Sequence, residues 1–179
     1  MNRGFRTKAS SLDGEIASNL AGGRSSVRVS VVAPDSSILV VHQEATLPST
    51  PAPGLVELDA ARIADVALTC ARRALDDAGP VDAVGIANQR ASTIVWDRAT
   101  GEAVGPGIGW QDLRTVGMCL TLQGQGLRVA PNASATKLAF LLDMADPKRE
   151  RDLCFGTVDT WVAWTISGGA VHVTDATNA

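Results

Sequence analysis

The sequence predicts an α/β fold, a mixed sheet flanked by helices, because strand-like and helix-like segments alternate along the chain. Apolar and polar side chains alternate over residues 27–32, and a second apolar stretch at residues 38–41 follows a short polar turn, which predicts a hairpin. Apolar residues then recur at helical spacing over residues 63–75. A short apolar run at residues 83–87 predicts a buried strand, so the order is strand, strand, helix, strand.

The second half of the chain continues this alternation. Apolar residues spaced three or four apart predict helices near residues 113–122, 137–144 and 158–166. We expect strands at residues 92–96 and 170–173, the second of them closing the domain.

The composition is that of a globular domain with a substantial core. Of the 179 residues, 45% are hydrophobic and 20% are charged, and the formal net charge is −3. This charge gives no electrostatic reason to expect binding to nucleic acid or to an anionic membrane, and no apolar run approaches the length of a membrane span. The three cysteines fit neither a disulfide framework nor a metal site, so we expect buried thiols in a cytoplasmic protein.

The first 18 residues are polar and irregular, and we expect them to be poorly ordered. They are basic but lack the apolar run of a signal peptide. The folded domain is therefore expected over residues 19–179.

Three polar residues, Asn88-Gln89-Arg90, separate the apolar run at residues 83–87 from the next apolar strand. Two amides and a guanidinium at a strand end cost free energy unless hydrogen-bond partners meet them. Those partners are either other groups of the protein or a ligand.

Several short enzyme signatures are absent from the sequence: a GxxxxGK[ST] phosphate loop, GxGxxG after a strand, HExxH and GxSxG. Longer blocks match a known pattern. They read GIANQRASTIVWDRATGEAVGPGIGWQDLRT, SATK and FGTVDTWVAWTISGGAVHVTDATNA. In this order they resemble the N-terminal domain of the FGGY carbohydrate kinases, glycerol kinases most of all, and they cover most of the chain from residue 27 onward.

The resemblance implies an actin-like, ribonuclease-H-like domain that is incomplete here. In the family, two such domains close around ATP, Mg²⁺ and a sugar or polyol, and phosphoryl transfer depends on that closure. The general base of the family and its nucleotide domain lie beyond the part that this sequence resembles. Residues 19–179 are accordingly expected to be a truncated N-terminal domain.

The resemblance also implies a turn in the first hairpin that faces the nucleotide phosphates with backbone N–H groups and hydroxyls. Ala21 stands where the family has an aspartate, and alanine offers no oxygen to Mg²⁺. This argues against ATP and Mg²⁺, the family's cofactors, in this chain, and a plain glycine-rich turn is the alternative. The residues that do fit the pattern of the turn are Gly23, Ser25, Ser26 and Arg28.

Three residues match substrate positions of the glycerol kinases. Arg90 matches the arginine of a substrate-binding Arg-Glu pair, whose second member is Ala91 here. Trp110 matches an aromatic residue that lines the polyol, and Asn132 takes the place of a tyrosine. The alternatives are that Arg90 forms a structural ion pair with Asp112 and that Trp110 is a core residue.

Lys137, in the SATK block, matches a family signature, although a lysine near a helix start is also common at the surface. Asp159 and Asp175 are carboxylates near the end of the chain, and neither is assigned as a catalytic base.

Three functional interpretations follow. The first is the N-terminal part of a glycerol-like polyol or sugar kinase, divergent and inactive by itself. The second is half of a split kinase whose complementary chain supplies the nucleotide site. The third is a binding module for a small polyol or sugar that performs no catalysis. Apolar surface left uncovered would promote self-association.

Overall fold

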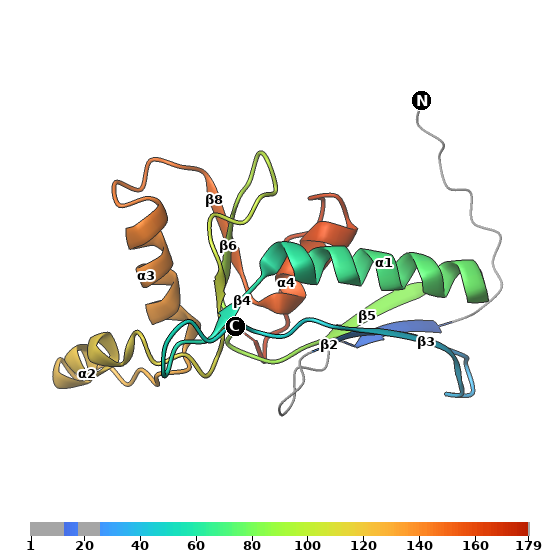
Figure 1. Cartoon of the computed structure of the whole chain (residues 1–179), viewed down its shortest axis with the longest axis horizontal. Helices are drawn as coiled ribbons and strands as arrows, with labels where there is room; N and C mark the ends of the chain where they lie inside the picture. The colour runs from blue at the N-terminus through green and yellow to red at the C-terminus, as the bar shows by residue number, and fades with distance from the viewer. Residues whose placement is uncertain (1–12, 18–25, 179) are drawn as a thin grey trace.

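The computed structural model describes residues 13–17, of which it fixes the backbone, and residues 26–178. A four-stranded mixed sheet has the order β3-β2-β1-β5 (Figure 1). β2 runs antiparallel to both β1 and β3, whereas β1 and β5 are parallel. The strands are β1 (Asp13–Ala17), β2 (Ser26–Val32), β3 (Ile38–Ala45) and β5 (Ala83–Ala87).

Two small antiparallel sheets and two helices lie toward the opposite end of the long axis from the β2–β3 hairpin, and a third helix packs near the middle of the molecule against α1 (Ala60–Ala78) (Figure 1). β4 (Glu57–Leu58) pairs with β7 (Gly107–Ile108), and β6 (Ile94–Asp97) pairs with β8 (Leu153–Gly156). The helices here are α2 (Val116–Gly124), α3 (Ser134–Ala145) and α4 (Val158–Ile166). No helix of the described residues is long and apolar enough to span a membrane.

The longest helix, α1 (Ala60–Ala78), covers one face of the large sheet (Figure 1). The carboxylate of Asp59 accepts a hydrogen bond from the backbone N–H of Arg62, which caps the first turn. Gly79 ends the helix with φ +86°, a conformation that glycine adopts without strain. Its buried stripe repeats every three or four residues, as the sequence predicts: Ala60, Ile63, Val66, Ala67, Cys70 and Ala74.

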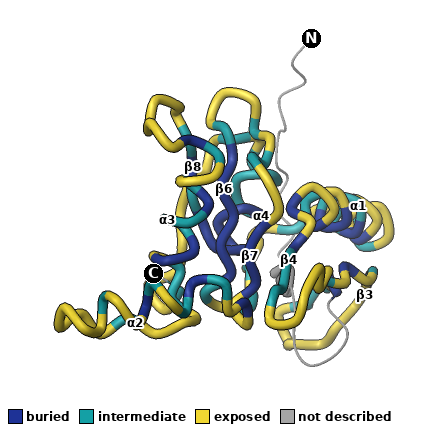
Figure 2. Tube along the Cα trace, turned by 60° about the vertical axis from the view of Figure 1, so that its left-hand side comes forward, coloured by how far each residue is buried: buried dark blue, intermediate teal, exposed yellow. Residues whose placement is uncertain are grey.

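The core lies between α1, β2 and α4 and continues into β6. Every second residue of β2, from Val27 to Val31, is buried against α1. Trp96 of β6 and Trp161 of α4 pack edge to face, with ring centroids 5.2 Å apart, and the indole N–H of Trp161 donates to the carbonyl of Ala60 at 2.8 Å. Figure 2 shows that the buried residues continue along β6, β7 and β8, whereas α2 is mostly exposed.

The three cysteines, Cys70, Cys119 and Cys154, are free and buried, which confirms the expected core role. Burial raises the pKa of the Cys70 and Cys154 thiols, so both remain protonated and unreactive at neutral pH.

The structure differs from the sequence-based expectation at both ends. The sequence predicts an irregular segment over residues 1–18, but residues 13–17 form β1, which pairs with β2, the next strand along the chain, and with the distant β5. The rest of that stretch lies outside the described residues. The closing strand predicted at residues 170–173 is wrong, since this segment joins no sheet in the described part of the chain. Instead, His172 Nε2 contacts the carbonyl oxygen of Phe155 at 2.9 Å.

The substitution Gly156→Ala should lower the free energy of unfolding by about 1–3 kcal/mol. A Cβ at this position would lie 2.5 Å from the Cβ of Thr160, so β8 and α4 would have to separate. Urea denaturation followed by tryptophan fluorescence measures the change.

Gly117→Ala in α2 is the matched control, because a Cβ there meets nothing within 4 Å. This control should leave stability unchanged or raise it by up to about 1 kcal/mol. Equal stability of Gly156→Ala and the unmodified chain would contradict the close approach of β8 to α4.

Candidate functional site

A pocket of about 990 Å³ opens where five segments meet: the loop after β5, the loop before α2, the start of α3, the β8–α4 turn and the C-terminal segment. Arg90, Trp110 and Asn132, the three residues predicted to bind substrate, all line it. The full lining is Arg90, Ala91, Trp110, Asn132, Ala133, Ser134, Ala135, Leu138, Phe155, Gly156, Thr157, Thr160, His172, Val173, Thr174, Thr177 and Asn178.

The polar residues after β5 have different partners. Asn88 contacts Asn178 at 2.8 Å, and Gln89 donates to the hydroxyl of Ser92 at 2.7 Å. Arg90, by contrast, is exposed at the pocket and makes no side-chain hydrogen bond with any other described residue. The protein therefore satisfies both amides internally and leaves the guanidinium available to a ligand.

Trp110 is 40% exposed, so the alternative that it is a core residue is wrong. Its position is fixed through the backbone, because its N–H donates to Ser92 Oγ at 3.2 Å. The same hydroxyl accepts from Gln89, so Ser92 ties the Arg90 loop to the Trp110 loop. The indole is thus held at the pocket without being buried.

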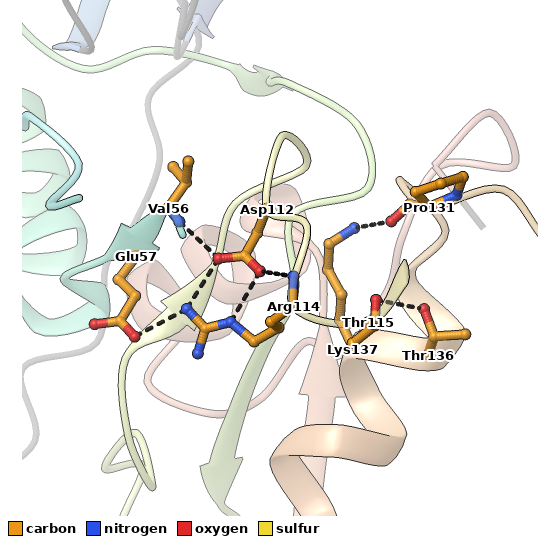
Figure 3. A network of polar contacts seen from close by, with 8 residues as sticks. All are labelled: Val56, Glu57, Asp112, Arg114, Thr115, Pro131, Thr136 and Lys137. Atoms are coloured by element: carbon orange, nitrogen blue, oxygen red, sulfur yellow. Dashed lines mark hydrogen bonds and ion pairs between the residues drawn. The ribbon is translucent and has the colours of Figure 1, made fainter. Parts of the chain in front are cut away.

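Asp112 forms the most buried ion pair near the site (Figure 3). It pairs with Arg114, not with Arg90, so the alternative of a structural Arg90–Asp112 ion pair is wrong. Asp112 also accepts from the backbone N–H of Val56 at 2.6 Å, and Arg114 reaches Glu57 at 2.9 Å. These bonds join the loop that carries Trp110 to β4.

Burial by itself raises the pKa of Asp112, but the hydrogen bonds from Arg114 and from the backbone N–H of Val56 outweigh it and hold that pKa below its ordinary value. The hydrogen bonds that Arg114 donates to the carboxylate of Asp112 raise the pKa of Arg114 in turn. Both groups therefore stay charged at neutral pH, and the pair cannot act as a general acid or base there.

Lys137 is fully buried, so its interpretation as a surface residue is wrong. Its ammonium group donates to the carbonyl of Pro131 at 3.1 Å, the residue before Asn132 (Figure 3). Burial lowers the pKa of Lys137. Beside it, the hydroxyls of Thr115 and Thr136 lie 3.0 Å apart, so α3 is fastened to both the Asn132 loop and the start of α2.

Asp159 lies behind the pocket wall, in the first turn of α4. Its carboxylate accepts hydrogen bonds from the hydroxyls of Thr157 and Thr174, which do line the pocket, and from the backbone N–H of Asp175. Burial by itself raises the pKa of Asp159, but these bonds outweigh it and lower the pKa. Asp159 is thus a saturated acceptor that holds the C-terminal segment against α4.

Two of the residues predicted to contact nucleotide, Gly23 and Ser25, lie outside the described residues. The other two, Ser26 and Arg28, lie on β2 and both bind the side chain of Gln43 on β3. Neither lines the pocket, and their role toward phosphate stays a prediction. The described residues contain no cluster of His, Cys, Asp or Glu that could hold a metal ion.

Several pocket residues were not found from the sequence. Thr157, Thr174 and His172 come from the β8–α4 turn and the C-terminal segment, to which the sequence analysis assigns no pocket residue. A signal was present in the polar cluster at residues 172–178, which follows the glycines that end α4. Only the fold shows that this cluster returns to Arg90, through the Asn178–Asn88 bond.

Comparison with known proteins identifies the family of the chain. The model of the N-terminal domain of the FGGY family of carbohydrate kinases matches residues 19–179. The chain belongs to this family.

Similar FGGY proteins include two bacterial glycerol kinases. The glycerol kinase of Aromatoleum aromaticum is 43% identical over 175 residues, and that of Thermus brockianus is 44% identical over 163 residues. The matches cover 88% and 81% of this chain but only 35% and 33% of the relatives. The chain thus spans about a third of the length of the curated relatives that it matches.

Solved structures of a glycerol kinase and a xylulose kinase share the fold. The crystal structure of Plasmodium falciparum glycerol kinase with ADP aligns with a TM-score of 0.71 at 19% identity, over 88% of this chain and 34% of that one. Xylulose kinase from Rhodospirillum rubrum aligns with a TM-score of 0.70 at 16% identity, over 86% and 33%. The actin-like, ribonuclease-H-like fold class predicted from the sequence is thereby confirmed.

The substitution Asp112→Ala should lower the free energy of unfolding by about 3–5 kcal/mol, because it leaves the mostly buried guanidinium of Arg114 without its main partner. Urea denaturation measures the loss. Asp152→Ala, which breaks the exposed Arg98–Asp152 pair, is the control and should leave the denaturation midpoint in place. Similar effects of the two substitutions would contradict the structural role of Asp112.

The substitution Lys137→Met should reduce the slope with which the free energy of unfolding increases with pH. Because the pKa of Lys137 is lowered in the folded state, the unfolded state binds more protons between that pKa and the ordinary lysine value, and the free energy of unfolding rises with pH there. Urea denaturation of both proteins at about pH 7, 8.5 and 10 gives the two slopes. Equal slopes would show that Lys137 does not titrate abnormally.

Proposed function

We propose that this chain supplies the carbohydrate-binding face of an FGGY-type kinase, with a small polyol or sugar bound in the pocket. One observation carries the proposal: Arg90, Trp110 and Asn132, far apart in sequence, line one pocket with side chains that have hydrogen-bonding or stacking capacity to spare. A guanidinium and an amide bind hydroxyl groups, and an indole packs against the carbon face of a sugar.

The proposed reaction of the complete kinase is transfer of the γ-phosphoryl group of ATP to a hydroxyl of the bound carbohydrate, in the cytoplasm. The role of this chain in it is to hold and orient the acceptor, which is a large part of phosphoryl-transfer catalysis. The described residues offer no cluster of His, Cys, Asp or Glu that could hold Mg²⁺, so they do not fit the family's metal site. A nucleotide site from outside the described residues is required in this proposal.

A second candidate function is carbohydrate binding without phosphoryl transfer. Ala91 favours it, because position 91 adjoins Arg90 on the pocket wall and provides no carboxylate to accept a hydrogen bond from substrate. An assay of ATP consumption in the presence of a carbohydrate that binds the chain distinguishes the kinase function from binding without catalysis. Turnover favours the kinase, whereas binding without turnover favours the binding module.

Isothermal titration calorimetry of the chain against a panel of polyols, sugars and their acidic derivatives tests the shared part of both proposals. At least one compound should bind, and Trp110→Ala should weaken it by at least about tenfold, because the exposed indole forms the apolar wall. Leu127→Ala, also at an exposed apolar residue but outside the pocket, is the control and should bind normally. Absence of binding by the whole panel would contradict the proposed function.

A further inference from the structure

The pocket carries a positive charge that no carboxylate on its described lining offsets. Arg90 lines the wall, is exposed and has no ion-pair partner among the described residues. Five other arginines pair with an aspartate or glutamate, whereas the remaining described arginines without such a pair lie outside the pocket. The free guanidinium therefore sets the charge of this pocket.

The nearby acids are already committed to other groups. Asp112 is bound to Arg114 and to a backbone N–H, and Asp159 is bound to two threonine hydroxyls and a backbone N–H. The residue next to Arg90 is Ala91, with φ +66°, which has no side-chain acceptor to offer. Arg90 therefore has no ion-pair partner among the described residues, although Asp159 keeps its own negative charge behind the hydrogen bonds that it accepts.

The start of α3 adds to this positive potential. Its first residues, Ala133, Ser134 and Ala135, line the same pocket, no side chain caps the helix, and its first turn holds no acidic residue. The N–H groups of an uncapped first turn favour an anion, as does the helix dipole. α4 also begins at the pocket, but Asp159 in its first turn offsets that end.

The remaining walls suit the carbon chain and the hydroxyls of a carbohydrate. Trp110, Leu138 and Phe155 are apolar, whereas Asn132 and Thr160 are polar. The polar groups of the lining with spare capacity are Arg90, Asn132, the hydroxyl of Thr160 and Oδ1 of Asn178, and because the guanidinium only donates, donors still outnumber acceptors among them. A neutral polyol, whose hydroxyls donate as well as accept, leaves part of this donor excess unused.

We propose that the pocket selects a polyhydroxy monocarboxylate, that is a sugar acid or a short hydroxy acid, over the matching neutral polyol. The inference rests on the proposed function, because it names the substrate class of the same pocket. The two carboxylate oxygens accept two parallel N–H hydrogen bonds from Arg90, the bidentate geometry for which a guanidinium is suited. The hydroxyls then reach Asn132, and the carbon chain lies on Trp110.

Calorimetry with matched pairs tests this inference on the chain of residues 1–179. The pairs are glycerol with glycerate and glucitol with gluconate, and glycerol 3-phosphate and inorganic phosphate are added to separate a carboxylate site from a phosphate site. Each acid should bind at least about tenfold tighter than its polyol. Its affinity should fall with added salt while that of the polyol stays constant.

Two variants assign the preference to the pocket. Arg90→Gln should remove the preference by weakening acids at least about tenfold and polyols by much less. Arg128→Gln makes the same change of charge at an exposed arginine outside the pocket, and it should retain the preference. Thermal unfolding of both variants confirms that they are folded as the unmodified chain is.

Each other outcome overturns the inference in a distinct way. If neutral polyols bind as tightly as their acids, the inference fails and the proposed function stands. If the phosphate compounds bind more tightly than the carboxylates, the pocket is a phosphate site and the inference fails. If the acid preference survives Arg90→Gln, the selecting charge lies elsewhere. If no compound of any class binds, the proposed function fails as well.

Discussion

The buried Asp112–Arg114 pair is the interaction on which the architecture of the site depends. Through one carboxylate it connects the loop before α2 to the backbone of Val56, and through Arg114 it reaches Glu57 in β4. Trp110 lies two residues away, so its place at the pocket follows from this pair. A fully buried carboxylate that lost its guanidinium would be costly, and the local geometry therefore has little freedom.

The parts of the fold that the sequence predicts are those whose signal is local. α1 has a capped start, a glycine end and an apolar stripe, and the β2–β3 hairpin alternates around a polar turn. β1, with its Asp, Gly and Glu residues, shows no such pattern because its order comes from two neighbouring strands. The short β4 and β7 and the missing closing strand depend in the same way on contacts between distant segments.

At the site, the sequence led to Arg90, Trp110 and Asn132 through their resemblance to family positions, and the structure brings them to one pocket. The sequence offered Arg90 as an alternative partner of Asp112, whereas the actual partner is Arg114, because which guanidinium meets a buried carboxylate is decided by the folding of the loop. The burial of Lys137 could not be predicted either, because the residues of the SATK block do not indicate that its side chain is enclosed. These properties arise from packing, which a single sequence encodes only indirectly.

The distribution of indoles has a spectroscopic consequence. The chain has four tryptophans and no tyrosine, so its near-ultraviolet absorption comes almost entirely from indole. Trp96, Trp161 and Trp164 form one contact cluster in and beside the core, whereas Trp110 stands apart at the pocket. Because Trp110 is the most exposed of the four, quenching by an aqueous solute reports mainly on the pocket, with a smaller part from the partly buried Trp164. The circular dichroism of the clustered rings reports on the interior, and the two can be followed in one sample.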